Sequence, residues 1–307
     1  MEFFNFKQKK IEGEGVALDF SRDGHLLALG ITPNPLQFQG HIVLLNSSTL
    51  SEVQRFEIQD KRLVSLKFSL DRDLLYVLLQ DNKYDYHLCS ILLSTGEIKK
   101  MASYGGTELC KSLDITDNGN YLAVVGVSVE IWDLRFNYIV KAYSSDDIES
   151  SLQAQFFSNR LIGIGGLELN EIIVYDFLTG AQEQRFLKPY TQSRQILVSN
   201  DKTMVLVSGI GIGGTFVYDL KTEKRVLEKK FNKDTLNSHF LFAINDSQIV
   251  RIGSRGFSSI TTQDEIYMRG KRYEPSYIIC SAASHSTPCF SFIQENYTLN
   301  LVWFQND

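Results

Sequence analysis

Three glycines have the spacing of a dinucleotide-binding loop. Gly209, Gly211 and Gly214 match G-x-G-x-x-G, in which N–H groups at the start of a helix hold a pyrophosphate. That chemistry requires a strand before the glycines and a helix after them. The apolar run Met204–Ser208 predicts the strand, but Thr215–Tyr218 consists of strand-forming residues. The pattern therefore favours two strands joined by a glycine-rich turn, and the sequence predicts no nucleotide site.

No other catalytic or metal-binding pattern is present in the 307 residues. The chain has no G-x-S-x-G, H-E-x-x-H or G-x-x-x-x-G-K-[ST] motif, and its four cysteines form no C-x-x-C pair. His285 and Cys289 have a spacing that a metal ion could use, but no second pair lies near them. A turn residue and a buried thiol are expected there instead. The sequence thus predicts no catalytic residue, no metal site and no cofactor.

Composition limits the class of protein. A hydrophobic content of 43% with 12% aromatic residues is sufficient for a substantial core, and 22% charged residues is ordinary. The net charge of -5 argues against general nucleic-acid binding. The N-terminal residues lack the apolar stretch of a signal peptide, and no apolar run is long enough to span a membrane. We therefore expect a cytoplasmic protein, with the nucleus as an alternative, that is neither secreted nor inserted in a membrane.

An aromatic residue followed by aspartate recurs every 43 residues, each time at the end of a short apolar strand. The pairs are Trp132-Asp133, Tyr175-Asp176 and Tyr218-Asp219. A second landmark repeats with a similar spacing and consists of an alternating strand, a polar turn and a second apolar strand. Its seven copies lie at 17–30, 65–79, 112–126, 152–166, 194–209, 239–253 and 276–293. A period in this range is typical of the four-stranded sheets of a β-propeller.

These repeats resemble the WD40 family over essentially the whole chain. The resemblance implies an all-β fold with a single domain, a seven-bladed β-propeller of four-stranded antiparallel blades. The predicted blades cover residues 13–57, 62–104, 109–144, 150–188, 193–232, 238–274, and 275–307 together with 2–10. The resemblance also gives the aromatic-aspartate pairs a structural role, with the ring packed between blades and the carboxylate at a strand end. The family's Gly-His pair is missing before each blade and only the third blade keeps Trp-Asp, so apolar packing is expected to hold the blades together.

The ends of the chain suggest how the ring closes. The last repeat supplies only three strands, near 276–281, 288–294 and 298–304, whereas the first blade begins near Val16. Residues 2–10 are therefore predicted to be the outer strand of the last blade, because an open ring would leave unpaired strand edges. A disordered tail is the alternative.

Function is expected in the loops that a rigid scaffold presents. Two loops, 32–40 and 80–87, are long and bring Phe38, Tyr84 and Tyr86 to one face, unless these rings pack down onto their own blades. The same face has acidic loops around the third and fourth blades and basic loops around the fifth to seventh. The acidic residues are Asp146, Asp147, Glu149, Glu168 and Glu171, and the basic ones are Lys188, Arg194, Lys233, Arg255, Lys271 and Arg272. Such a division of charge would orient a partner.

We therefore expect a non-catalytic scaffold or adaptor that binds protein or peptide partners within a larger complex. The predicted partner-binding residues are Phe38, Tyr84, Tyr86, Asp146, Asp147 and Glu149. One alternative is a propeller enzyme that acts on a small molecule in the central channel, with lactonases as the nearest type. A second alternative is an accessory subunit of an RNA-associated complex.

Overall fold

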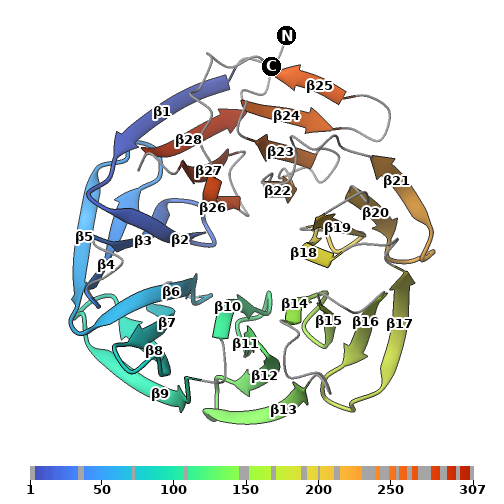
Figure 1. Cartoon of the computed structure of the whole chain (residues 1–307), viewed down its shortest axis with the longest axis horizontal. Helices are drawn as coiled ribbons and strands as arrows, with labels where there is room; N and C mark the ends of the chain where they lie inside the picture. The colour runs from blue at the N-terminus through green and yellow to red at the C-terminus, as the bar shows by residue number, and fades with distance from the viewer. Residues whose placement is uncertain are drawn as a thin grey trace.

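The computed structural model of the chain consists of β-strands joined by turns, with no helix among the residues that it describes (Figure 1). The structure describes residues 4–33, 38–70, 73–106, 110–144, 152–166, 171–187, 192–199, 201–210, 215–229, 239–242, 249–253, 256–260, 265–268, 278–283, 289–294 and 298–304. In this part of the chain no helix is long and apolar enough to cross a membrane.

The described strands form seven four-stranded antiparallel sheets, which follow one another along the chain. The first sheet contains β2 (Glu14–Phe20), β3 (Leu26–Thr32), β4 (Gly40–Asn46) and β5 (Glu52–Ile58). The second contains β6 (Lys61–Phe68), β7 (Leu74–Asp81), β8 (Tyr86–Leu92) and β9 (Ile98–Tyr104). The third contains β10 (Cys110–Ile115), β11 (Tyr121–Gly126), β12 (Ser128–Asp133) and β13 (Tyr138–Ser144).

The remaining sheets repeat this order. The fourth contains β14 (Leu152–Phe156), β15 (Leu161–Gly166), β16 (Glu171–Asp176) and β17 (Gln182–Leu187). The fifth contains β18 (Gln192–Val198), β19 (Met204–Ile210), β20 (Thr215–Asp219) and β21 (Arg225–Lys229). The sixth contains β22 (His239–Phe242), β23 (Ile249–Gly253), β24 (Gly256–Ile260) and β25 (Glu265–Met268). The seventh contains β26 (Ile278–Ala283), β27 (Cys289–Gln294), β28 (Thr298–Phe304) and β1 (Phe4–Lys10).

The sheets are arranged around a common centre, with the first strand of each sheet innermost (Figure 1). The predicted all-β class is confirmed, and the repeated four-stranded antiparallel sheets are consistent with a β-propeller-like fold. The seventh sheet is built from both ends of the chain. Its outer strand β1 pairs antiparallel with β28, from Phe4 opposite Phe304 to Lys10 opposite Thr298.

The turn after the innermost strand has the same hydrogen bond in the first five sheets. A serine or threonine hydroxyl oxygen accepts a hydrogen bond from the backbone N–H at or near the start of the next strand. The donor–acceptor pairs are Leu26 to Ser21, Leu74 to Ser69, Tyr121 to Thr116, Leu161 to Ser158 and Met204 to Ser199, at 2.9–3.1 Å. These short polar side chains satisfy backbone groups in the turn and so explain the polar stretch in each repeat.

The core lies between the faces of neighbouring sheets. Apolar side chains of the first and second sheets, such as Leu44 and Leu66, form one buried cluster. Between the third and fourth sheets, the Phe177 ring packs edge-on against Tyr121 and Phe156, with ring centres 5.0 and 5.5 Å apart. Because the first four sheets are covered on both faces by such clusters, their interiors are apolar runs, and burial between sheets stabilises the arrangement.

Candidate functional site

The glycine pattern lies between two paired strands. β19 and β20 are antiparallel neighbours, with Ser208 opposite Thr215. A strand follows Gly214 directly, so the helix that a dinucleotide-binding loop requires is not there. Gly211 and Gly214 themselves lie outside the described residues. The flanking strands therefore agree with the interpretation of this segment as a hairpin.

The aromatic-aspartate pairs lie at the ends of the third strands of their sheets. Trp132 and Tyr218 are buried, and the Tyr175 ring packs on Tyr143 with their centres 4.8 Å apart. Each aspartate accepts hydrogen bonds from backbone N–H groups in the turn that follows. Asp176 accepts from Leu178 and Thr179 at 3.0 and 3.1 Å, Asp219 accepts from Lys221 and Thr222 at 3.0 and 2.7 Å, and Asp133 accepts from Arg135 at 3.0 Å. These contacts stabilise the fold.

The predicted partner-binding aromatics divide into two groups. Tyr84 is 57% exposed, and Phe38 is half-buried with its ring edge-on to Tyr84, the two centres lying 5.9 Å apart. The guanidinium of Arg62 lies 5.7 Å from the centre of the Phe38 ring, a cation–π distance. Phe38, Tyr84 and Arg62 together form a surface between the first two sheets, here called the aromatic ledge.

A hydrogen-bonded network holds the ledge in place. Buried Gln80 accepts hydrogen bonds from the Arg62 guanidinium, one of them at 2.7 Å, and donates to the backbone oxygen of Tyr84 at 3.2 Å. Asp81 accepts from the N–H groups of Lys83 and Asp85 in the same turn. Tyr84 itself has a positive φ of 68°, a conformation that L-residues rarely adopt. The turn is thus fixed before any partner binds.

His87 adds a second support for this turn. Its Nε2 lies 2.9 Å from Asp81 Oδ2, and its Nδ1 lies 3.0 Å from Ser103 Oγ. The hydrogen bond to His87 and those from the turn lower the pKa of Asp81, although burial opposes this shift. Serine, histidine and aspartate are also the side chains of hydrolase triads, but here Asp81 closes the turn that presents Tyr84. The contacts among Asp81, His87 and Ser103 were not evident in the sequence, because Ser103 comes from a different strand.

Two sequence expectations need correction or lie beyond the described residues. Tyr86 was expected on the surface, but it is 5% exposed and packs in the cluster between the second and third sheets, so that expectation is wrong. The reason is register: β8 begins at Tyr86, and only residues 82–85 remain in the turn. The predicted acidic residues Asp146, Asp147 and Glu149 lie outside the described residues.

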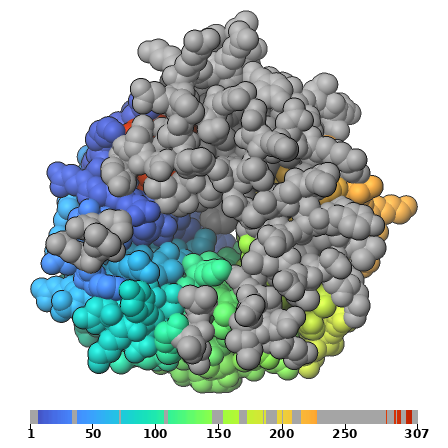
Figure 2. Space-filling model, viewed as in Figure 1, coloured from blue at the N-terminus to red at the C-terminus, as the bar shows by residue number. Residues whose placement is uncertain are grey.

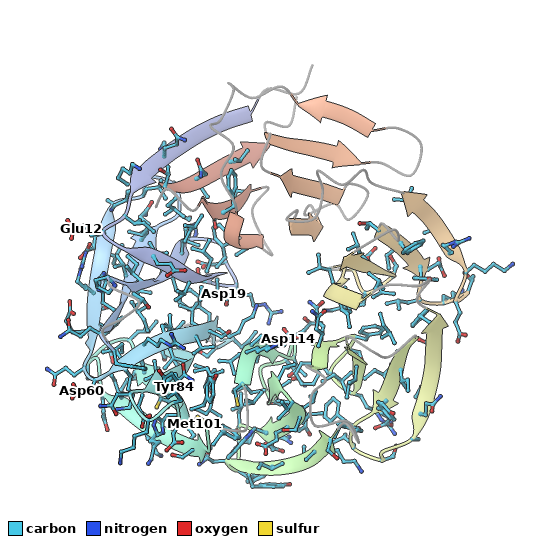
Figure 3. The ribbon with its side chains drawn as sticks, viewed as in Figure 1. Glu12, Asp19, Asp60, Tyr84, Met101 and Asp114 are labelled. Atoms are coloured by element: carbon cyan, nitrogen blue, oxygen red, sulfur yellow. The ribbon has the colours of Figure 1, made fainter. Side chains whose placement is uncertain are left out.

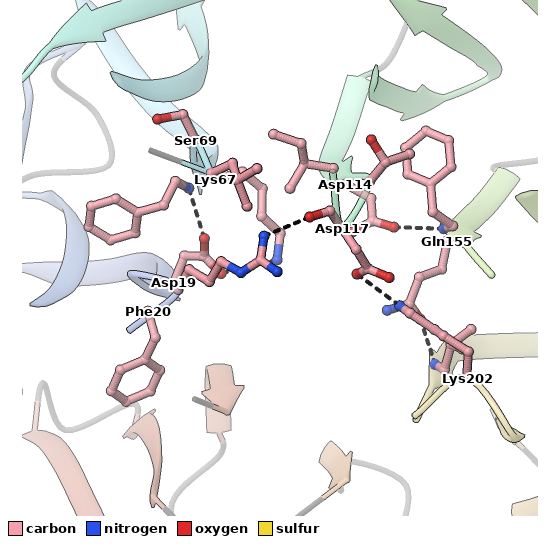
Figure 4. A pocket seen from close by; sticks show the side chains of 15 residues that line it. Asp19, Phe20, Lys67, Ser69, Asp114, Asp117, Gln155 and Lys202 are labelled. Atoms are coloured by element: carbon pink, nitrogen blue, oxygen red, sulfur yellow. Dashed lines mark hydrogen bonds and ion pairs between the residues drawn. The ribbon is translucent and has the colours of Figure 1, made fainter. Parts of the chain in front are cut away.

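A cavity of about 460 Å³ lies at the centre of the molecule, where the innermost strands of the first five sheets end (Figures 3 and 4). The space-filling view shows a central opening on the face turned to the viewer (Figure 2). The cavity is here called the channel pocket. Its charged residues are Asp19, Arg22, Lys67, Asp114, Asp117 and Lys202. It lies at the turn after the innermost strand, and the aromatic ledge lies at the opposite end of the sheets.

Side chains in the pocket connect neighbouring innermost strands. Asp19 Oδ1 pairs with Lys67 Nζ at 3.1 Å, and Asp19 Oδ2 accepts from the Phe68 N–H at 2.8 Å. Gln155 makes the same kind of contact from the fourth sheet to the fifth, because its Oε1 accepts from the N–H of Val198 at 2.9 Å. A side chain of one sheet thus caps a backbone group of the next, and its remaining polar atoms face the pocket.

The third sheet contributes Asp114 at the matching position. Its Oδ2 accepts from the Phe156 N–H of the fourth sheet at 2.7 Å. Burial raises the pKa of Asp114, and the nearby charges of Lys67 and Lys202 only partly offset this shift. For Lys67, burial favours the neutral amine, but the charges of Asp19 and Asp114 outweigh it and raise the pKa, so the side chain stays an ammonium.

The sequence contained a signal for this pocket, a charged residue at the same place in several repeats, which was recognised only once the structure was known. Asp19, Lys67 and Asp114 each precede the apolar landmark residue of an innermost strand, namely the buried Phe20 and Phe68 and the partly buried Ile115. Adjacent strand residues point to opposite faces of a sheet, so the three charges occupy equivalent places at the ends of their innermost strands, where the pocket lies. Overlaying the repeats would have brought these charges together. Within the described residues, no group of three His, Cys, Asp or Glu side chains is arranged to hold a metal ion.

No protein-family model matches the chain, and no curated protein is significantly similar to it. Function must therefore be inferred from the residues of the two sites.

Proposed function

We propose that this protein is a non-catalytic interaction module that binds a protein or peptide partner through the aromatic ledge. The observation that supports this proposal most strongly is the exposure of Tyr84 in a turn whose conformation is fixed from behind by Gln80 and Asp81. Exposed tyrosine and arginine side chains on a rigid support are the residues that contribute most binding energy in protein interfaces. A preorganised turn also loses less entropy on binding.

The chemistry of the ledge suggests the kind of partner. The Arg62 guanidinium bonds to the neutral amide oxygen of Gln80, and no carboxylate pairs with it among the described residues. Phe38 and Tyr84 offer aromatic surface beside this charge. We propose a segment that places an acidic side chain on Arg62 and an apolar side chain against the two rings.

We also propose the finer architecture, a seven-bladed propeller of the WD40 type in which β1 closes the ring. The repeated turn hydrogen bonds and the seven sheets support it. β1 also contacts the first sheet, because Lys9 donates to the backbone oxygen of Leu50 at 2.9 Å and Lys7 donates to that of Ser48. An N-terminal strand that completes the last sheet and contacts the first through its side chains is a device that would close a ring.

Site-specific photocrosslinking tests the binding face. The photoreactive residue p-benzoylphenylalanine is placed at position 84, and at position 138 as the control, since Tyr138 is 51% exposed but lies on the outer strand β13. Irradiation should crosslink the protein to its partner in a discrete adduct when the photoreactive residue is at position 84, but not when it is at position 138. Adding Phe38→Ala with Arg62→Gln should abolish that adduct, because both changes remove contacts of the ledge. Equal adducts from both positions, or an adduct that survives the double substitution, would contradict the proposal.

A further inference from the structure

The channel pocket has an unusual balance of charges. Three of its side chains are cationic and three are anionic. Two pairs neutralise one another directly: Lys67 with Asp19 at 3.1 Å, and Lys202 with Asp117 at 3.2 Å (Figure 4). Arg22 and Asp114 remain, and neither forms an ion pair with any described residue. The pocket therefore presents one cation and one anion that no direct partner neutralises.

Arg22 lies at the exposed mouth of the pocket and crosses from the first sheet to the third. Its Nη1 donates to the backbone oxygen of Asp117 at 2.8 Å, which is a neutral acceptor. A guanidinium has five N–H donors in a planar fork that matches the two oxygens of a carboxylate. The single bond to Asp117 orients the group and leaves donors for an anion.

Asp114 lies deeper, on the innermost strand of the third sheet. Its carboxylate accepts hydrogen bonds from the backbone N–H groups of Phe156 and Ile115, and no described side chain donates to it. Lys67 and Lys202 lie near enough to favour the charged form of Asp114, but neither forms an ion pair with it, so burial of this carboxylate has a cost that a cationic ligand would reduce. Burial raises the pKa of this group, which is consistent with that cost.

We propose that the channel pocket binds a small zwitterion, with the carboxylate of the ligand on Arg22 and its ammonium group on Asp114. The cavity of about 460 Å³ is within the size range of small-molecule sites. The side-chain amide of Gln155, whose oxygen already accepts from Val198, has its N–H groups available as further donors. This site is independent of the aromatic ledge, because the two lie at opposite ends of the sheets.

A homologous series of amino acids tests the proposal and measures the separation of the two charges. Glycine, β-alanine, 4-aminobutyrate and 6-aminohexanoate are titrated against the full chain, with thermal unfolding and calorimetry as readouts. One member should bind saturably and raise the melting temperature by roughly 2–4 °C at about ten times its Kd. Butyrate and butylamine, which each have one of the two charges, should bind at least about tenfold more weakly.

Two variants assign the roles of the charged residues. Arg22→Gln removes the guanidinium, and Asp114→Asn removes the carboxylate while its amide oxygen still accepts the Phe156 N–H. Each should weaken the best ligand at least about tenfold, because a hydrogen bond between charged groups is lost. Asp114→Asn should also leave butyrate binding unchanged. The control, Lys221→Gln, changes an exposed cation outside the pocket and should have no effect. Each variant is compared with its own unliganded melting temperature.

Several outcomes would overturn the inference. One is that no member of the series binds. A second is that butyrate or butylamine binds as tightly as the zwitterions, which would indicate a site for a single charge. A third is that both pocket variants bind as the parent does, which would place the ligand elsewhere. The photocrosslinking result at position 84 bears on none of these outcomes, so failure of either proposal is recognised separately.

Discussion

Aspartates in this protein occupy two kinds of environment, and their protonation differs accordingly. In the turns, Asp133 and Asp176 are buried but accept several hydrogen bonds, and Arg135 and Arg160 lie beside them. Hydrogen bonds from Arg135 lower the pKa of Asp133, although burial opposes the shift. In the pocket, Asp114 accepts hydrogen bonds from two backbone N–H groups and forms no ion pair with a described residue, and burial raises its pKa. Burial is the largest influence on Asp114 and raises its pKa, whereas hydrogen bonds and a neighbouring arginine outweigh burial at Asp133 and Asp176 and lower theirs.

The raised pKa of Asp114 predicts a pH-dependent effect of Asp114→Asn on stability without ligand. The folded state holds the proton more tightly than the unfolded state, whose carboxyl has a pKa of about 3.9. The wild type is therefore destabilised as pH rises from about 4 through the raised pKa, and the asparagine variant is not. The free energy of unfolding of the variant should exceed that of the parent at pH 7, and the difference should vanish below pH 4.

Urea unfolding at a series of pH values measures this difference. Glu97→Gln, an exposed carboxylate on an outer turn, should give no pH-dependent difference from the parent. If Asp114→Asn is less stable than the parent at pH 7 and recovers in acid, the carboxylate stabilises the fold and the assigned direction is wrong.

At the residue scale, the sequence predicted structural residues better than functional ones. The aromatic-aspartate pairs recur along the chain, so spacing alone revealed them. Tyr86 was assigned to the wrong side, because one residue of register decides whether a strand side chain faces the core. That Arg22 and Asp114 form no ion pair depends on which charges of four different sheets meet, and no linear pattern encodes that.

At the element scale, close packing between neighbouring sheets limits the size of the side chains on their strands. Gly163 on β15 shows this limit, since a Cβ added there would lie 2.4 Å from Cε1 of Phe157. The Phe157 ring is buried and packs on Phe186, their centres 6.3 Å apart, so it has little room to move. The glycine thus serves close packing between the fourth and fifth sheets. Its role was invisible in the sequence, although the strands themselves were predicted from their alternation and turns.

Gly163→Ala should therefore destabilise the protein by about 1–3 kcal/mol, the usual cost of overpacking a core. Gly105→Ala is the matched control, because a Cβ there would meet no atom within 4 Å. Both variants are measured by urea unfolding under identical conditions. A Gly163→Ala protein as stable as the Gly105→Ala protein would show that the Phe157 ring moves aside at little cost.

At the scale of the whole molecule, stability depends on how the sheets join end to end. Neighbouring sheets from the first to the fifth share apolar clusters, and the same kind of cluster joins the seventh sheet to the first through residues such as Ile293 and Leu29. β1 adds hydrogen bonds to this junction, with Gln8 donating to the side-chain oxygen of Asn300 at 2.9 Å. The sequence predicted this strand from a count of strands, because the last repeat contained only three. It did not predict the contacts of Lys7 and Lys9 with the first sheet.

Deletion of residues 1–10 tests the closure that we propose. It removes β1 and keeps Ile11, which is buried in the cluster between the seventh and first sheets. The truncated protein should lose much of its thermal stability and aggregate, because the exposed edge of β28 can pair with other chains. Size-exclusion chromatography and thermal unfolding measure both effects. A synthetic peptide of residues 1–11 should restore a monomer with a higher melting temperature, whereas the same peptide with proline at Phe6 and Gln8 should not, since proline lacks the N–H that pairing requires. A truncated chain that stays monomeric and melts as the parent does would show that β1 is dispensable and that the apolar clusters alone hold the sheets together.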